Sequence, residues 1–166
     1  MADQFEARLA ELGLSLPERC TPRGNFLPYH QDGTLIFMAG QICEWNGDVP
    51  YAGPVLAPGQ TAPDGLEVQD LETGRKAAEI CGLNLLFHLR AACDGDLGRV
   101  RTIVRVGGFV NCLSGFDQSP AVINGASDLF INLFGDSGRH ARTAVGVSGL
   151  PANAAVEVDA VIALKP

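Results

Sequence analysis

The chain has 166 residues, of which 46% are hydrophobic and 19% are charged, and its formal net charge is −7. This length and apolar content are typical of one globular domain with a single core. The acidic charge repels phosphate backbones, and basic residues cluster no further than pairs such as Arg75 and Lys76, so a role in nucleic-acid binding is disfavoured. The chain has no long apolar run and no leader-like N-terminus, which predicts a cytoplasmic protein that does not contact a membrane.

The first predicted element is a short amphipathic helix over residues 3–14, where apolar side chains recur at helical spacing: Phe5, Leu9 and Leu12. We expect this helix to be peripheral. The chain is therefore divided into an N-terminal helical extension, residues 1–21, and a main domain, residues 22–166.

A buried strand is predicted next, over the apolar run TLIFMAGQI at residues 34–42. The Asn46-Gly47 pair that follows is a turn signal and predicts a hairpin with residues 47–56. The span 50–65 is rich in Pro and Gly, so we expect an irregular surface loop there.

A long helix is predicted from Asp70, a favourable N-cap, to about Cys93. One stripe of this helix is apolar and is expected to cover a sheet; it contains Ala78, Cys81, Leu85 and Leu89. Alternation over residues 100–112 predicts a strand. Pro120 suits the first turn of a second helix through Phe134, with Asp117 or Ser119 before it as the start.

Two strands, residues 142–149 and 155–164, are predicted to close the chain as a second hairpin. That pairing would place Gly146 opposite Glu157 and leave Arg142 about 13 Å further along its strand. Side chains as long as these could span that distance only with a ligand between them or by meeting across a subunit boundary.

The final strand has two unlike faces. One face is apolar and carries Val156, Val158, Ala160, Ile162 and Leu164, whereas the other carries Glu157 and Asp159. The acidic face suits solvent, a partner subunit or a ligand, and the residues alone do not decide among the three. Arg142 has a planar fork that can bind a carboxylate through two hydrogen bonds, although a surface ion pair fits its position equally well.

Five cysteines, an odd number without C-x-x-C spacing, predict reduced and mostly buried thiols; they are Cys20, Cys43, Cys81, Cys93 and Cys112. The three histidines, His30, His88 and His140, form no recognisable ligand set. We therefore expect neither a disulfide framework nor a metal site.

Two segments, GNFLPYHQDGTLIFMAGQI and VINGASDLFINLFGDSGRHARTAVGVSGLPANAAVEVDAVIAL, resemble the RidA (YjgF-type) reactive imine deaminase family. The resemblance covers roughly residues 22–164, and ARTAVGV…LP…VEVDA is its most specific part. It implies an α+β, chorismate-mutase-like fold, in which a mixed sheet carries two helices on one face. It also implies a homotrimer with ligand clefts between protomers.

The resemblance implies a role for each of several residues. The arginine matching Arg142 binds the substrate carboxylate, and the glutamate matching Glu157 helps to activate water. Asn124, Ala39 and Gly40 match residues that line the cleft. The implied reaction is hydrolysis of small 2-imino or enamine acids to 2-oxo acids and ammonia, without a metal or an organic cofactor.

Two substrate-binding positions depart from the family pattern. Phe26 stands where the family commonly has a tyrosine that contacts substrate or water, and Tyr29 could replace it only if the backbone bends. Ala39 stands where a serine is common. Arg139 and His140, close to Arg142, are additions that either extend anion binding or face solvent.

Three functions fit these residues. The preferred one is a deaminase, or a closely related hydrolase, acting on small carboxylic acids. The alternative is a non-catalytic trimer that binds a small carboxylate, which the losses at Phe26 and Ala39 favour. An endoribonuclease, an activity long associated with the family name, is disfavoured by the acidic composition.

Overall fold

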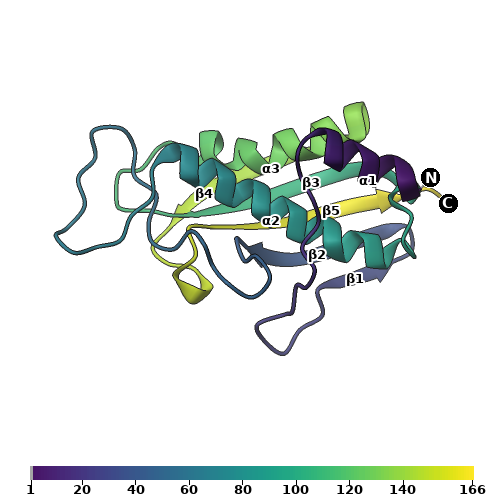
Figure 1. Cartoon of the computed structure of the whole chain (residues 1–166), viewed down its shortest axis with the longest axis horizontal. Helices are drawn as coiled ribbons and strands as arrows, with labels where there is room; N and C mark the ends of the chain where they lie inside the picture. Colours follow the sequence, from purple (N-terminus) through teal and green to yellow (C-terminus); the bar gives the residue numbers. More distant parts are fainter. Residues whose placement is uncertain (1) are drawn as a thin grey trace.

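The structure is a computed structural model that describes residues 2–166. Its centre is a five-stranded mixed sheet with the strand order β1-β2-β5-β3-β4 (Figure 1). The β3 and β4 strands are parallel, whereas every other neighbouring pair is antiparallel. The strands are β1 (Tyr29–Asp32), β2 (Leu35–Ile42), β3 (Val100–Asn111), β4 (Ala141–Val147) and β5 (Val156–Leu164).

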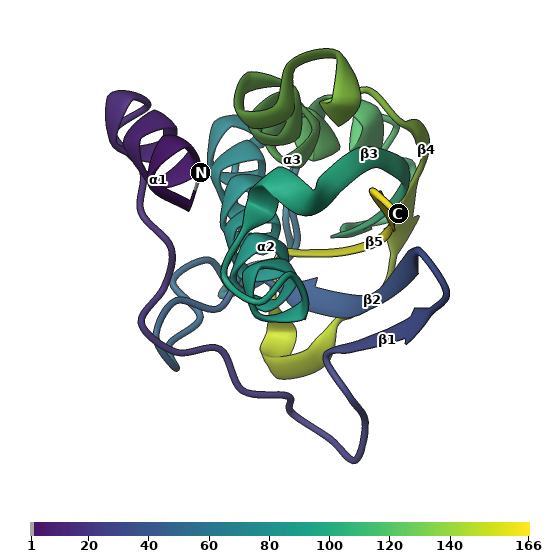
Figure 2. The ribbon, with the colours of Figure 1, turned by 90° about the vertical axis from the view of Figure 1, so that its right-hand side faces the viewer.

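Two helices, α2 (Leu71–Ala92) and α3 (Ser119–Phe134), cover one face of the sheet, as Figure 2 shows. Asp70 caps α2, because its side chain accepts a hydrogen bond of 2.7 Å from the Thr73 N–H. The two helices can pack closely because a side chain at Gly125 would overlap the Arg75 carbonyl oxygen. Three short 3-10 turns complete the chain: η1 (Leu97–Arg99), η2 (Gly135–Gly138) and η3 (Pro151–Asn153).

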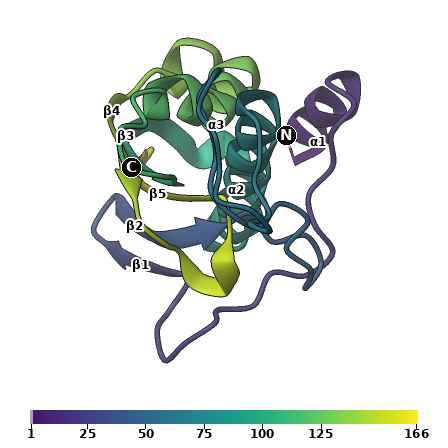
Figure 3. The ribbon, with the colours of Figure 1, turned by 90° about the vertical axis from the view of Figure 1, so that its left-hand side faces the viewer.

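The N-terminal helix α1 (Ala2–Glu11) lies outside this helical layer. The Phe5 and Phe134 rings are 5.3 Å apart, and Glu6 pairs with Arg90 of α2. Leu9 is buried against the core. The connection from α1 then runs past the helices to the far edge of the sheet, where β1 begins (Figures 2 and 3).

The α+β fold class, the long helix from Asp70 and the strand near residues 100–112 are confirmed. The second helix also ends at Phe134 as predicted, but its N-cap is Gln118, with no side-chain capping bond. The two faces of β5 are confirmed as well, because its alternate apolar side chains are buried under the helices. Within residues 2–166, no helix combines the length and the hydropathy needed to cross a bilayer.

Both predicted hairpins are wrong. β2 pairs with β1 through a turn at Gly33, whose φ is 58°, and the Asn46-Gly47 turn forms only an isolated bridge between Trp45 and Asp48. At the other end of the chain, β3 lies between β4 and β5. Because α3 connects β3 to β4, these two strands become parallel neighbours, as crossover connections require.

The same topology changes the predicted pairing of the two charged strands. Gly146 pairs with Val110, and Glu157 pairs with Phe109, so Gly146 does not lie opposite Glu157. The distance expected along a hairpin therefore does not apply to Arg142.

Candidate functional site

The two residues expected to act together, Arg142 and Glu157, lie on opposite faces of the sheet. Arg142 pairs with Val106 of β3, which pairs with Ala160 of β5, and both of these partners are buried under the helices. Glu157 belongs to a different row, with Phe109 as its partner. Directly opposed side chains share a face and successive ones alternate, so Arg142 points to the helical face and Glu157 to the other.

Arg142 is held by α3 through one stripe of that helix. Its Nη1 group donates to Asn124 Oδ1 at 2.8 Å and to Ser127 Oγ at 3.0 Å, and its Nη2 group donates to the Pro120 carbonyl oxygen at 3.1 Å. Pro120, Asn124 and Ser127 are spaced i, i+4 and i+7, so they project from one side of the helix. Asn124, which the family resemblance implies is a cleft residue, thus lies beside Arg142.

Three of the five guanidinium N–H groups of Arg142 have partners among the described residues. The other two are the Nε–H and one N–H of Nη2, on neighbouring nitrogens. Two adjacent donors suit a carboxylate that accepts two hydrogen bonds. The half-buried guanidinium is therefore fixed in place and keeps two N–H groups without a partner among the described residues.

Ser127 and His140 extend this arrangement, and we call the set of Asn124, Ser127, His140 and Arg142 the arginine cluster. The Ser127 Oγ lies 2.9 Å from His140 Nε2. Ser127 is not among the predicted binding residues, although the i, i+4, i+7 spacing on the predicted helix could have pointed to it. For His140 the sequence left two alternatives open, extended anion binding or exposure to solvent. His140 is an addition to the family pattern that the structure brings next to Arg142 through that serine.

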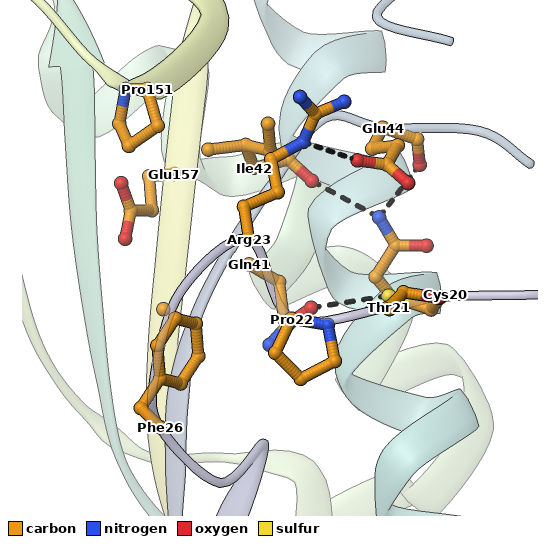
Figure 4. A pocket seen from close by; sticks show the side chains of 12 residues that line it. Cys20, Thr21, Pro22, Arg23, Phe26, Gln41, Ile42, Glu44, Pro151 and Glu157 are labelled. Atoms are coloured by element: carbon orange, nitrogen blue, oxygen red, sulfur yellow. Dashed lines mark hydrogen bonds and ion pairs between the residues drawn. The ribbon is translucent and has the colours of Figure 1, made fainter. Parts of the chain in front are cut away.

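The second part of the site is a cavity of about 160 Å³ that is lined by Glu157 of β5 and by residues of β2, and we call it the glutamate pocket (Figure 4). Figure 4 shows Glu157 and Phe26 on one side of it and Glu44 and Cys20 on the other. Its lining residues come from the connection before β1, from β2 and the segment that follows it, and from α2, η3 and β5: Cys20, Thr21, Pro22, Arg23, Phe26, Gly40, Gln41, Ile42, Glu44, Asn84, Pro151 and Glu157.

The Glu157 carboxylate lies directly over Gly40. A methyl group at position 40 would overlap Glu157 Oε1, so glycine is needed for this close approach. The register between β2 and β5 shifts between Met38 and Gln41, at a bulge that contains Ala39 and Gly40. Bulges commonly redirect side chains next to functional sites, and this one leaves room for the carboxylate.

The pKa of Glu157 is raised above its ordinary value, first by burial and then by the nearby Asp159 carboxylate. Both effects disfavour the charged form. A carboxylate with a raised pKa takes up a proton more readily than an ordinary one, which is the property needed of a general base.

Phe26 and Gly40, which are expected to bind substrate, line the glutamate pocket together with Glu157. Ala39 is not among the lining residues, and its N–H donates to the Pro28 carbonyl oxygen at 2.9 Å. Tyr29 packs against the core and does not line the pocket, so within this protomer it does not replace the hydroxyl that Phe26 lacks.

Sequence reasoning missed most of the pocket wall. Arg23 Nε pairs with Glu44 Oε2 at 2.6 Å, and the side chain of Glu44 is only 11% exposed. Cys20 Sγ lies 3.2 Å from Gln41 Oε1, and burial, with a smaller effect of Glu44, raises the pKa of this thiol to about 11. No local pattern marks these residues, because they come from an irregular connection, from β2 and from the segment that follows β2.

The comparisons with known proteins agree with this fold. Residues 6–163 match the family described as "YjgF/chorismate mutase-like, putative endoribonuclease". A curated relative, Protein TCP17 of Trypanosoma cruzi, is 39% identical over 160 residues, which cover 96% of this chain and 93% of that protein.

Two solved structures are similar over nearly their whole length. The protein Atu1372 of Agrobacterium tumefaciens, described as of unknown function, has 35% identity and a TM-score of 0.83, covering 99% of this chain and 96% of its own. A protein of Shewanella oneidensis described as a "putative endoribonuclease" has 31% identity and a TM-score of 0.84, covering 97% and 99%. E. coli TdcF with bound serine shares the fold, at 17% identity and a TM-score of 0.55, over 91% of this chain and 94% of its own.

Proposed function

This chain belongs to the YjgF/chorismate-mutase-like family, and from that premise we propose that it is a hydrolytic deaminase of small 2-imino or enamine carboxylic acids. The active sites lie between protomers of a homotrimer. Each site combines the arginine cluster of one protomer with the glutamate pocket of another.

The observation that carries this proposal is the placement of Arg142 and Glu157 on opposite faces of one sheet. Within one protomer, Arg142 is bonded to α3 and Glu157 lies over Gly40 of β2. A ligand of a few atoms can touch both groups only if they come from different copies. The resemblance that predicted their roles also implied clefts between protomers.

The sheet face that carries Glu157 has the composition of a surface that a second copy covers. Phe37 is 44% exposed and Val145 is 41% exposed on this face. On β3 and β5, the two strands between β2 and β4, Arg105 Nη1 and Asp159 Oδ1 are 3.3 Å apart. Exposed apolar side chains around a paired charge suit a self-complementary or cyclic contact between identical chains.

The two groups divide the chemistry between them. Arg142 binds the substrate carboxylate through its two free N–H groups and so fixes the imine carbon in position. Glu157 takes a proton from water as the water oxygen bonds to that carbon, and it returns the proton to nitrogen. The hydroxyl proton on that carbon is then passed through Glu157 to nitrogen as the carbon–nitrogen bond breaks, which releases ammonia and leaves the 2-oxo acid. TdcF, which shares the fold, has bound serine, a ligand that carries the carboxylate needed by such a clamp.

A non-catalytic trimer that binds a small carboxylate is the second candidate. The phenyl ring of Phe26 lines the glutamate pocket and offers no hydrogen bond, and Ala39 offers no side-chain hydroxyl. Ribonuclease activity, which the family description and the Shewanella protein's name suggest, is opposed by the net charge of −7, because contacts to phosphates require Lys or Arg.

The test is ammonia release in a coupled assay that generates 2-aminoacrylate, with 2-oxo acid binding measured in parallel. The proposal predicts a rate above that of the uncatalysed reaction. Binding of pyruvate without any rate enhancement would favour the non-catalytic trimer. The absence of both would contradict both functions, and cleavage of RNA by the same preparation would support the third.

We expect Gly40→Ala to reduce turnover at least tenfold while changing the free energy of unfolding by less than about 1 kcal/mol. The added methyl group overlaps the tip of the Glu157 side chain, which can move aside at low cost but then leaves its position over the pocket. Gly149→Ala is the matched control, because a side chain there meets no neighbour. Turnover by Gly40→Ala at the wild-type rate would contradict the placement of Glu157.

A further inference from the structure

A chain of hydrogen bonds leads away from Arg142 into the protein. Arg142 Nη1 donates to Ser127 Oγ at 3.0 Å, Ser127 Oγ lies 2.9 Å from His140 Nε2, and His140 Nδ1 lies 2.6 Å from the Gly138 carbonyl oxygen. A carbonyl oxygen can only accept, so Nδ1 carries the proton and, in the neutral ring, Nε2 accepts. Ser127 therefore donates its single hydrogen to His140 and turns its lone pairs toward Arg142.

The surroundings of His140 favour this neutral state. Burial lowers the pKa of His140, and this effect is larger than the rise caused by the Gly138 carbonyl. The Arg142 charge, with a smaller effect than either, also lowers it. The edge-to-face ring of Phe130 packs against it at 6.1 Å. The pKa of His140 therefore lies below the ordinary histidine value of about 6.5, because protonation has to overcome both burial and the positive charge of Arg142.

The other charged groups near His140 are occupied elsewhere. On η2 and the residue that follows it, Asp136 faces Arg139 at 3.5 Å, and both side chains are largely exposed. On α3, Asp128 pairs with Arg75 of α2. Among the described residues, no carboxylate is hydrogen-bonded to His140. Arg142 is therefore the charged group that protonation of His140 affects most directly.

We propose that His140 is a positioning residue that acts through Ser127 to hold Arg142 ready for a ligand carboxylate, and that protonation of His140 releases this hold. The proposal deepens the proposed function, because it concerns the same arginine. The family description gives no function to Ser127 or His140, and the alternatives that the sequence left open for His140 do not include positioning Arg142.

The physical reason is a change in the number of donors. A protonated His140 has hydrogens on both nitrogens, so Nε2 donates to Ser127 Oγ instead of accepting from it. The serine oxygen then faces two cationic donors, and its own hydrogen loses its acceptor. The bond to Arg142 weakens, and the guanidinium is freed from one of its three anchors on α3.

The test measures pyruvate affinity at pH 7.5 and at a lower pH at which an NMR titration shows His140 to be protonated, in the Glu157→Gln background, which removes the titration of that carboxyl group. We expect affinity to be roughly threefold to tenfold weaker at the lower pH, the effect of one lost hydrogen bond. His140→Gln keeps an acceptor for Ser127 but does not titrate, so its affinity should be equal at both pH values. Equal pH dependence in the two proteins would overturn the proposal.

A second readout separates this proposal from the proposed function. In the unliganded protein, the NMR signal of the Arg142 Nε–H should shift with the titration of His140, and Ser127→Ala should abolish that coupling. If pyruvate does not bind at any pH but the coupling is present, the carboxylate clamp fails and the positioning role stands. If the NMR signal of the Arg142 Nε–H does not shift as His140 titrates, the positioning role is overturned, whatever the protein binds.

Discussion

Arg142→Lys should weaken the binding of small 2-oxo acids almost as much as Arg142→Ala does. Lysine keeps the charge but loses the planar fork, and a single ammonium cannot bond to Asn124, Ser127 and Pro120 while also offering two parallel donors to a ligand. Truncating one partner of a buried charged pair costs about 2–5 kcal/mol, so we expect affinity for pyruvate to fall at least roughly 30-fold in both variants.

Isothermal titration of the wild-type protein and both variants measures this effect. Arg101→Ala is the matched control, because Arg101 is an exposed arginine on β3 and its loss should leave affinity unchanged. Wild-type affinity in Arg142→Ala would remove the carboxylate clamp from the account, and wild-type affinity in Arg142→Lys would reduce it to a simple charge effect.

Glu157→Gln should lower turnover by about 10²–10⁴-fold, the usual contribution of a general base, while sparing the binding of 2-oxo acids. Glutamine has nearly the same shape but cannot take a proton from water. In the wild-type protein, activity should rise with pH through the raised pKa of Glu157, because the base acts in its deprotonated form. Steady-state rates across a pH series measure both effects, with Asp32→Asn on exposed β1 as the control.

The same substitution should stabilise the fold near pH 7. A carboxyl group whose pKa is higher in the folded than in the unfolded state binds its proton more tightly when folded, so stability is lost as pH rises through that range. Glutamine does not titrate and avoids this loss. Urea unfolding should therefore show a higher midpoint for Glu157→Gln than for the wild-type protein at pH 7, and the difference should vanish near pH 4.

Local patterns predicted the helices well. Asp70 is a capping residue in front of a regular apolar stripe, and Pro120 marks the first turn of α3, so short-range chemistry was sufficient for both. Strand pairing is different, because it depends on partners far apart in the sequence. Nothing in residues 142–164 signals that β3 inserts between β4 and β5. The turn at Asn46-Gly47 does form, but it joins only one bridged pair, Trp45 and Asp48, and so adds no strand to the sheet.

The site was predictable only where the family resemblance reached it. The resemblance implied that Arg142, Asn124, Gly40 and Glu157 belong to one cleft, and this remains a prediction. The structure shows that Arg142 contacts Asn124 and that Gly40 lies beneath Glu157. Ser127 and most of the glutamate pocket were missed, since their roles arise from packing. The division at residue 21 and the homotrimer remain predictions, and Cys20 from the N-terminal side of that division lines the same pocket as Glu157.

Subunit complementation tests the central claim, that each site joins the arginine cluster of one protomer to the glutamate pocket of another. Arg142→Ala and Glu157→Gln chains, each inactive alone, are unfolded together, refolded as mixed oligomers and assayed for 2-aminoacrylate hydrolysis. In a randomly mixed cyclic trimer about one quarter of the sites receive both intact groups, so about a quarter of the wild-type activity should return. Mixed oligomers that form but stay inactive would show that both groups must come from one chain, and would contradict the account.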